Sequence, residues 1–198
     1  MSVVAERGKK RIILAITGAT GMIYVTALLE LLAGEEVEVH GIISAAGRQV
    51  LRLEADAEPG DLAGVCWYGV DDFTAPMASG SSRYDAMIIL PCTMGTLGAI
   101  AAGVSSNLIH RAADVSLKER RPLLLAVRET PLGRTHLKNM LAVHDAGAII
   151  CPPMPSFYTR PADLRQMATN FAGRICDQVG IRIAGLSRWQ GMPGPEKD

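Results

Sequence analysis

The chain has 198 residues, of which 48% are apolar and 20% are charged, enough for one medium-sized domain with a full hydrophobic core. Its twenty basic residues balance its twenty acidic ones and no polybasic block occurs, so we expect no nucleic-acid partner. Residues 1–10 are polar, without the apolar segment of a signal peptide, and no run reaches the roughly twenty apolar residues of a membrane span; we therefore expect a cytoplasmic protein without membrane association.

Short apolar runs alternate along the chain with stretches of helical periodicity. The predicted strands cover 11–17, 37–43, 86–90, 123–127 and 148–151. The predicted helices cover 22–33, 45–53, 95–102, 108–119, 135–146 and 163–179. Because the strands lack clear alternation and each is followed by a helix, we expect one doubly wound α/β domain over 1–198 with a mostly parallel sheet. It would end in a Gly- and Pro-rich tail over 181–198.

Polar residues follow almost every predicted strand. In chain order these are Thr17–Gly21, Ser44, Cys92–Thr96, Arg128–Glu129 and Pro152–Tyr158. Ligands of doubly wound sheets bind beyond the carboxyl ends of the strands, so these segments predict one pocket. Their hydroxyls, glycines and fixed cations suit a phosphorylated ligand.

The turn Gly18–Gly21 could present backbone N–H groups to an anion at a helix N-terminus. It is not the GxGxxG fingerprint, and the second strand ends in Ser44 and not in a ribose-binding acid, which disfavours NAD and favours a mononucleotide. An ordinary tight turn is the alternative. Thr93–Thr96 repeats the pattern, with a helix cap as its alternative. Two such turns at one sheet edge favour a ligand.

Five basic residues lie close together in the sequence: Arg111, Lys118, Arg120, Arg121 and Arg128. Arg111 and Lys118 are seven apart and share a helix face. We interpret Arg120 and Arg121 as a solvated face. Arg128 directly follows a buried strand, where a charge needs a partner or a ligand.

Neither the histidines nor the cysteines show metal-ligand spacing, so we expect no metal. Cysteines 66, 92, 151 and 176 form no CxxC pair and are predicted to be reduced core residues.

Taken together, these segments resemble the flavin prenyltransferase family, the UbiX-type proteins, from about Arg11 to Trp189. The similarity is densest in DDFTAPMASGSS, PCTMGTLGAIAAG, NLIHRAADVSLKERRPLLLAVRETPL and PMPSFY. It implies a Rossmann-like or flavodoxin-like subunit in a homo-oligomer, a dodecamer in the family. It also implies transfer of a dimethylallyl group from dimethylallyl monophosphate to N5 and C6 of reduced FMN, without a metal. The product, prenylated FMN, would serve partner decarboxylases in ubiquinone biosynthesis or phenolic acid metabolism.

The resemblance also assigns roles to residues. FMN would contact Gly18, Ala19, Thr20, Ser44, Thr93, Met94, Gly95, Thr96 and Arg128. The prenyl phosphate would be held by Ser79, Lys118, Tyr158 and Arg174, with Arg111 of the basic cluster beside them. Glu54 and Glu129 match residues that handle protons and assist the phosphate, and Trp189 matches an aromatic of the closing tail. Phe73 stands where a tryptophan is common beside the prenyl group, and Thr20 where a serine is common. Some of these residues would reach the site from a neighbouring subunit.

Two alternatives stay open at this point. A phosphopantothenoylcysteine-type decarboxylase would carry a Pro-x-Met-Asn motif, and the nearest match, Pro76–Ser79, lacks the asparagine. A non-catalytic FMN-binding subunit of a decarboxylase system is the second. The intact set Glu54, Lys118, Glu129, Tyr158 and Arg174 favours an enzyme.

Overall fold

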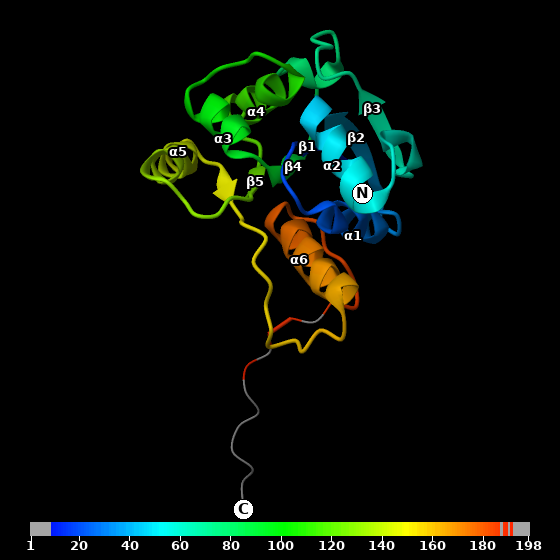
Figure 1. Ribbon diagram of the computed structural model, residues 1–198. Coiled ribbons are helices and arrows are strands. Elements are labelled where there is room, and N and C mark those ends of the chain that lie inside the picture. Colours follow the sequence, from blue (N-terminus) through cyan, green and yellow to red (C-terminus); the bar gives the residue numbers. More distant parts are fainter. Residues whose placement is uncertain (1–8, 187, 190, 192–198) are drawn as a thin grey trace, which may run out of the picture.

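A six-stranded sheet forms the centre of the computed structural model, which describes residues 9–186, 188, 189 and 191 (Figure 1). The strands are Lys10–Ile16 (β1), Val37–Ile43 (β2), Val65–Tyr68 (β3), Ala86–Cys92 (β4), Leu123–Val127 (β5) and Ile149–Ile150 (β6). Their order is β3-β2-β1-β4-β5-β6, and every adjacent pair is parallel. This is the strand order of the Rossmann fold, so the predicted doubly wound α/β fold is confirmed.

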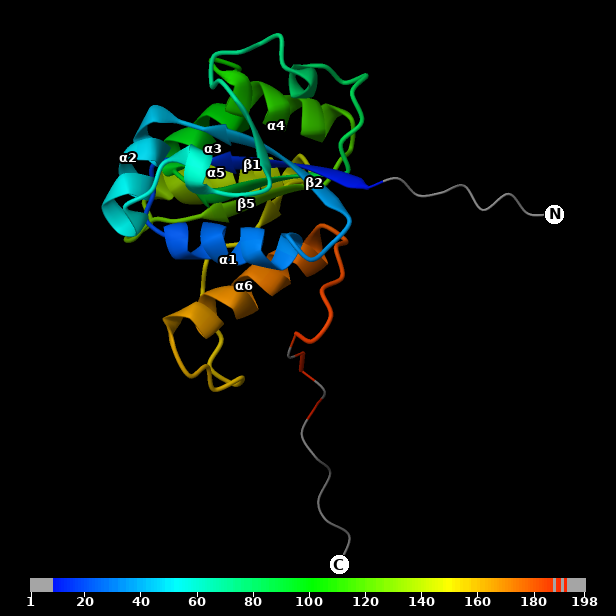
Figure 2. The ribbon, with the colours of Figure 1, turned by 90° about the vertical axis from the view of Figure 1, so that its right-hand side faces the viewer.

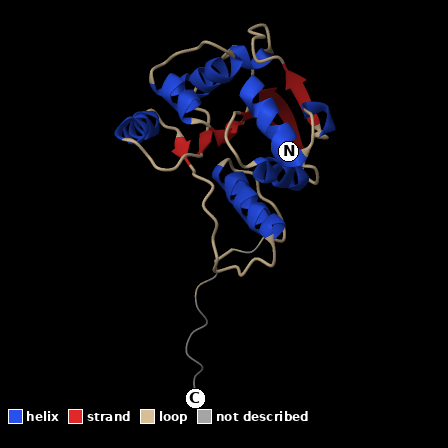
Figure 3. Cartoon of the chain, viewed as in Figure 1, coloured by secondary structure: helices blue, strands red, loops and turns tan. Residues whose placement is uncertain are grey.

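Helices cover both faces of the sheet. They are Met22–Leu32 (α1), Ala45–Ala55 (α2), Met94–Ala101 (α3), Leu108–Lys118 (α4), Arg134–Asp145 (α5) and Leu164–Gln178 (α6). Figure 2 shows α4 on one side of the sheet and α1 with α6 on the other, and Figure 3 shows the long loop segments between α2 and β4 and between β6 and α6. The predicted strands and helices agree with the observed ends to within two residues. Short 3-10 turns add Pro59–Asp61 (η1) and Pro76–Ala78 (η2).

Strand β3 was not predicted. It has four residues, Val65–Tyr68, and pairs only with β2 at the edge of the sheet. A short edge strand buries little apolar surface and leaves no long apolar run in the sequence, so periodicity alone does not reveal it.

The two faces of the sheet pack into two separate apolar clusters, which explains why the strands show no apolar–polar alternation. Ile12, Leu14 and Ile16 of β1 face the side of α1 and α6. Ile13 and Ala15 face the side of α3 and α4. Successive side chains of a strand point to opposite faces, and here both faces are dry, so every position is apolar.

Three further observations concern the cysteines, membrane-spanning helices and metal ligands. All four cysteines are free, but Cys66 is exposed, so the prediction of core cysteines was wrong for that residue; it lies on the edge strand β3. Over the described part of the chain, no helix is long and apolar enough to cross a membrane. Within the same residues, no group of three His, Cys, Asp or Glu side chains could hold a metal ion.

Candidate active site

The loops that follow four strands are hydrogen-bonded to one another at the carboxyl edge of the sheet. The buried Thr17 hydroxyl donates to the Pro91 carbonyl oxygen at 2.8 Å and accepts from the Thr93 N–H at 2.9 Å. The Ser44 N–H donates to Ile16 at 3.0 Å, and the Arg128 N–H donates to Cys92 at 3.0 Å. These bonds join the loops after β1, β2, β4 and β5, which confirms that these predicted segments meet.

Thr17 was predicted in a strand-end segment of the pocket but was given no role of its own, although its side chain joins two of these loops. The signal was available in the sequence, because a hydroxyl directly after a buried apolar strand needs a hydrogen-bond partner when it is itself buried. Which loop would supply that partner depends on β1 and β4 being neighbours in the sheet.

Two of the predicted ligand residues cap helices. Ser44 Oγ accepts from the Gly47 N–H at 3.0 Å at the start of α2. Thr93 Oγ1 accepts from the Thr96 N–H at 3.2 Å at the start of α3 and donates to Thr96 Oγ1 at 3.0 Å. The cap interpretation of Thr93 is therefore confirmed. Both helices point their N-termini at the carboxyl edge, where an anion is favoured.

Glycines let the backbone come close at this edge. A Cβ on Gly18 would lie only 2.4 Å from the Ala46 Cβ, so the loop after β1 rests directly on the start of α2. A Cβ on Gly95 would have its nearest neighbour, Thr93 Oγ1, 4.0 Å away. The surface above the first turn of α3 is thus open to a ligand.

Glu54, near the end of α2, supplies an anion to the turn after β1. Its carboxylate accepts from the N–H groups of Gly21 at 2.9 Å and Met22 at 2.8 Å, at the start of α1. Burial by itself would raise the pKa of Glu54, but hydrogen bonds from Thr20, Gly21 and Met22 and the charge of Arg128 lower it. The predicted anion-binding turn is therefore already paired, at these two N–H groups, with a carboxylate of the chain itself.

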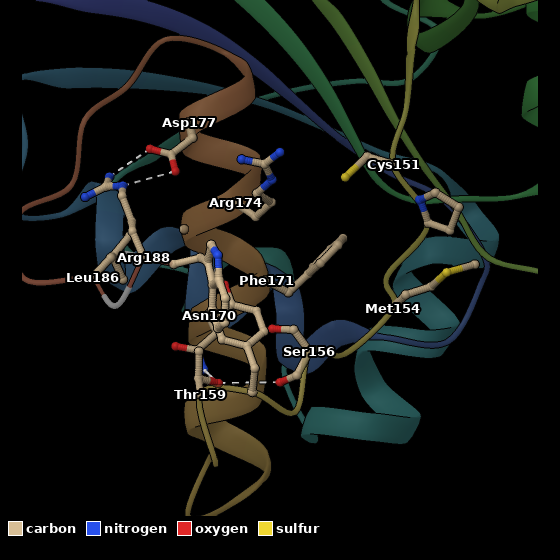
Figure 4. Close-up of a pocket in the computed structure, with 14 residues that line it drawn as sticks. Cys151, Met154, Ser156, Thr159, Asn170, Phe171, Arg174, Asp177, Leu186 and Arg188 are labelled. Atoms are coloured by element: carbon tan, nitrogen blue, oxygen red, sulfur yellow. Dashed lines mark hydrogen bonds and ion pairs between the residues drawn. The ribbon is translucent and has the colours of Figure 1, made fainter. Parts of the chain in front are cut away.

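A cavity of about 610 Å³ lies beside α6 (Figure 4). Its walls are formed by the loop after β6, by α6 and by the tail segment that follows α6. The lining residues include Cys151, Met154, Ser156, Tyr158, Asn170, Phe171, Arg174, Asp177, Leu186, Arg188 and Trp189. The Tyr158 and Trp189 rings meet edge to face with centroids 5.5 Å apart. The structure therefore brings together three predicted residues, Tyr158, Arg174 and Trp189. The polar lining residues Asn170, Asp177 and Arg188 were not predicted.

The remaining predicted phosphate ligands gather around the segment 78–80. Arg111 Nε donates to the Ala78 carbonyl oxygen at 3.0 Å, and its guanidinium pairs with Asp114 at 2.8 Å. A Cβ on Gly80 would lie 2.6 Å from Lys118 Nζ. Arg111 and Lys118 thus face the same segment, as their spacing predicted.

Other polar contacts complete this cluster. Lys118 forms an ion pair with Glu119, and Ser79 Oγ lies 2.9 Å from Ser81 Oγ. The Arg121 guanidinium donates to the Gly80 carbonyl oxygen at 2.6 Å. The interpretation of Arg121 as solvated was therefore wrong, because the backbone of a loop distant in sequence supplies its acceptor. Arg120 is exposed, as expected.

The part of this cluster around Lys118 and Arg121 lies toward the amino edge of the sheet, away from the strand-end loops. Arg111 lies one turn from the start of α4, where the Leu108 N–H donates to the Val70 carbonyl oxygen just after β3. Arg121 stands two residues before β5 begins, and the chain between Gly80 and β4 binds the first residues of β1 through Arg11 and Asp85. A five-residue strand such as β5 is about 16 Å long. Within one chain, Lys118 at the end of α4 is therefore separated from Glu54 and Arg128 by roughly the length of the strands.

The last two predicted residues lie on exposed turns. Glu129 follows Arg128, and its Oε1 accepts from the Thr130 N–H at 3.0 Å. Phe73 is 47% exposed in the turn after β3. Neither is among the described residues that line the cavity of Figure 4.

Fold and site together define a flavoprotein-type Rossmann domain, and a family model described as Flavoprotein matches residues 2–170. The flavin prenyltransferase UbiX of Methanothermobacter thermautotrophicus is 48% identical, over 92% of this chain and 96% of that protein. The flavin prenyltransferase PAD1, mitochondrial, of Saccharomyces cerevisiae is also 48% identical, over 92% of this chain and 76% of that protein. The chain belongs to the flavin prenyltransferase family, whose members are transferases, and the predicted resemblance is confirmed.

Solved structures agree with this assignment. The crystal structure of AnUbiX (PadA1) in complex with FMN and dimethylallyl pyrophosphate has a TM-score of 0.89 at 40% identity, covering 93% of this chain and 100% of that one. A dodecameric FMN-dependent UbiX-like decarboxylase from Escherichia coli O157:H7 has a TM-score of 0.87 at 40% identity, covering 91% and 100%. A phosphopantothenoylcysteine (PPC) decarboxylase mutant is 20% identical with a TM-score of 0.59 and shares the fold alone.

Proposed function

We propose that this chain joins the dimethylallyl group of dimethylallyl monophosphate to N5 and C6 of reduced FMN. The product, prenylated FMN, would serve a partner decarboxylase acting on aromatic or α,β-unsaturated acids. The observation that carries the proposal is the meeting of the loops after β1, β2, β4 and β5 at one sheet edge, where α2 and α3 begin. The complex of the AnUbiX relative with FMN and dimethylallyl pyrophosphate supports it.

The carboxyl edge fits a flavin mononucleotide. The open surface above Gly95 lies at the start of α3, and the first N–H groups of a helix have no acceptor within the helix. In this proposal FMN is held by Gly18, Ala19, Thr20, Ser44, Thr93, Met94, Gly95, Thr96 and Arg128. Bound reduced FMN supplies the two nucleophilic atoms, N5 and C6. Arg128 supplies a fixed positive charge beside it.

The leaving phosphate requires cations and hydroxyl donors that stabilise its charge as it departs. Lys118 and Arg174 supply the charges, Ser79 and Tyr158 supply hydroxyls, and Arg111 fixes the segment that carries Ser79 through its bond to Ala78. In one chain these residues fall into two separate places, the cavity beside α6 and the segment 78–80. A second copy of the chain has to complete the site.

We therefore propose a homo-oligomer, with the dodecamer of the Escherichia coli relative as the expected assembly. Large apolar side chains on the surface support an assembly that covers them. Leu137 and Leu141 on α5 are 53% and 61% exposed, and Phe157 after β6 is 71% exposed. Sedimentation velocity on the purified protein would decide between a monomer and an oligomer.

In this proposal, acidic residues transfer the proton and aromatic residues stabilise the positive charge on the allylic group. Closing the new ring requires a base, and Glu54 can act as one because hydrogen bonds keep its carboxylate ionised. The same bonds lower its pKa and so make it a weaker base than an ordinary glutamate. Glu129 assists the phosphate. The faces of Phe73 and Trp189 would stabilise positive charge on the allylic group and keep water away from it.

Mass spectrometry of the flavin tests the proposal. After incubation with FMN, a reductant and dimethylallyl monophosphate, we expect a flavin heavier by one dimethylallyl unit. A parallel reaction with the pyrophosphate determines which donor is used. Unmodified flavin that stays tightly bound would instead support a non-catalytic FMN-binding subunit.

Variants then test the residues. Lys118→Ala and Glu129→Gln should still bind FMN and should slow prenyl transfer by at least about tenfold, which corresponds to about 1.4 kcal/mol of lost transition-state stabilisation. Lys9→Ala, at an exposed position before β1, is the control and should react at the parent rate. Turnover at the parent rate in both active-site variants would refute the assigned phosphate site.

The absence of a metal and the cytoplasmic location remain predictions. Treatment with a chelator should leave prenyl transfer unchanged, and loss of activity that added divalent metal restores would contradict the metal-free proposal. The location needs its own measurement, because the yeast relative is named as mitochondrial. Fluorescence of the tagged full-length chain in its native cell would supply it.

A further inference from the structure

The chain beyond α6 folds back along that helix. The Ile181 N–H donates to the Cys176 carbonyl oxygen at 2.9 Å, and Ile181 and Ile183 are buried in the apolar cluster under α1 and α6. Leu186 then lies directly on the helix, because a Cβ on Gly173 would be only 2.3 Å from Leu186 Cδ1. The absence of a side chain at Gly173 is what lets the tail approach α6 so closely.

An ion pair holds the next part of the tail. Both oxygens of Asp177 accept from Arg188, from Nη2 at 2.8 Å and from Nε at 3.4 Å (Figure 4). Such a two-point contact fixes the orientation of the guanidinium as well as its distance. Arg188 also donates to the Ile183 carbonyl oxygen at 3.4 Å, a contact between two parts of the tail.

Trp189 directly follows Arg188 in the chain. The Trp189 ring meets the Tyr158 ring edge to face with centroids 5.5 Å apart. Trp189 is still 61% exposed, so its own packing holds it weakly. Among the described residues, Asp177–Arg188 is the ion pair adjacent to it in sequence that joins the tail to α6. Through Arg188, Asp177 is therefore linked to the part of the cavity wall that Trp189 and Tyr158 form.

Asp177 also affects the charge of the cavity. It stands three residues after Arg174 on α6, and both side chains line the cavity. Figure 4 shows the Asp177 carboxylate turned to Arg188, with no contact drawn to Arg174. Hydrogen bonding to Arg188 is the largest cause of the lowered pKa of Asp177, and the charges of Arg188 and Arg174 add to it.

We propose that Asp177 is a positioning residue, which holds Arg188 so that Trp189 closes against Tyr158 over the cavity. The inference rests on the proposed function only in taking this cavity as the place of the prenyl phosphate. Because the pair is partly exposed, its loss should change the opening equilibrium of the tail by about two- to fivefold and leave the rest of the fold intact.

The position of Trp189 can be measured without any substrate. The chain has two tryptophans, and Trp67→Phe leaves Trp189 as the single emitter. Within the described residues, the buried Trp67 Nε1 has no hydrogen-bond partner, so this background loses no such bond. In the full-length chain, we expect Asp177→Asn to raise the quenching of Trp189 by acrylamide about twofold or more.

Two further variants make the result specific. Arg165→Gln is the matched control, since Arg165 lies on the same helix and pairs with Glu30 at 3.0 Å, away from the cavity lining; its quenching should match the parent. Gly173→Ala should raise quenching by pushing Leu186 and the tail outward while leaving every charge in place. The exchanged pair Asp177→Arg with Arg188→Asp should restore part of the parent value.

Kinetics connects the tail to the reaction. For Asp177→Asn we expect KM for dimethylallyl monophosphate to rise about two- to fivefold with a smaller change in kcat, because an open tail weakens the wall of the donor site. If acrylamide quenches Trp189 equally in Asp177→Asn and in Arg165→Gln, the inference is overturned. It is also overturned if quenching rises in Asp177→Asn while its KM for dimethylallyl monophosphate equals that of the parent. If the parent protein transfers no prenyl group, the proposed function fails, and the quenching result still decides whether Asp177 positions the tail.

Discussion

Replacing Glu54 with alanine tests whether this side chain caps α1 from a distance. Helix α1 begins after Gly21, which offers no side-chain cap, and the Glu54 carboxylate takes the N–H groups of Gly21 and Met22 in its place. Loss of a helix cap costs about 0.5–2 kcal/mol, and bonds to a charged acceptor lie in the upper part of that range when they are not fully exposed.

The expected loss is therefore about 1–2 kcal/mol at neutral pH. For a chain of this size, each kcal/mol lowers Tm by about 2–4 °C, so Glu54→Ala should melt about 2–8 °C below the parent. Differential scanning calorimetry at one fixed protein concentration measures this, without and with FMN. Glu30→Ala is the control, because among the described residues the Glu30 side chain on α1 forms an exposed pair with Arg165, and its loss should change stability by less than about 0.5 kcal/mol.

The pH dependence gives a second readout of the same contact. The folded pKa of Glu54 is lowered from its ordinary value of 4.5, so its contribution is present above that value and is lost as the pH falls through the folded pKa. The Tm difference between parent and Glu54→Ala should therefore shrink on acidification below 4.5. Equal melting temperatures at neutral pH would refute the capping role and leave Glu54 free for proton transfer alone.

Two further predictions concern buried polar side chains. Thr17→Val should cost about 1–3 kcal/mol of stability and weaken FMN binding, because it removes the hydroxyl between Pro91 and Thr93. Denaturant melts measure the stability and flavin titration measures the affinity. Thr26→Val is the control, because among the described residues the Thr26 hydroxyl bonds within α1; unchanged FMN affinity in Thr17→Val would contradict the assigned role. His40 is buried beside Tyr68 and Tyr84, and burial, followed by the charge of Arg11, lowers its pKa from 6.5, with Glu38 opposing. As the pH falls below 6.5, the unfolded chain therefore binds more protons at His40 than the folded chain does, and the free energy of unfolding should decrease. This decrease should be smaller in His40→Gln. Urea midpoints at about pH 7.5 and about pH 5.5 measure it, and an equal decrease in the parent and in His40→Gln would contradict the prediction.

Local sequence patterns predicted the elements of the fold well. The run 11–17 and the helix from residue 22 lie almost where they were expected, because apolar periodicity reports which faces of an element are buried. Ser44 and Thr93 cap their helices as hydroxyl residues ahead of a helical stretch should. The edge strand β3 escaped because four residues that pair on one side carry little of that periodicity.

Contacts between distant segments could not be predicted in this way. Glu54 and Gly21 are 33 residues apart, and only the packing of α2 beside the start of α1 brings the carboxylate to those N–H groups. Arg121 was predicted to be solvated, but in the structure it donates a hydrogen bond to the Gly80 carbonyl oxygen, 41 residues away in the sequence. A charged side chain in the sequence does not reveal its partner, since the partner is chosen by how whole elements pack.

The sequence by itself determined the doubly wound fold, the polar strand ends and, through long ordered motifs, the flavin prenyltransferase family. The tertiary structure alone decided how the predicted site residues are distributed: Glu54 and Arg128 at the carboxyl edge, Lys118 toward the amino edge, and Arg174 in the cavity beside α6. The physical reason is that parallel strands of fixed length hold the two edges of the sheet apart. Under the proposed function, a second copy of the chain would bring these separated side chains into one site.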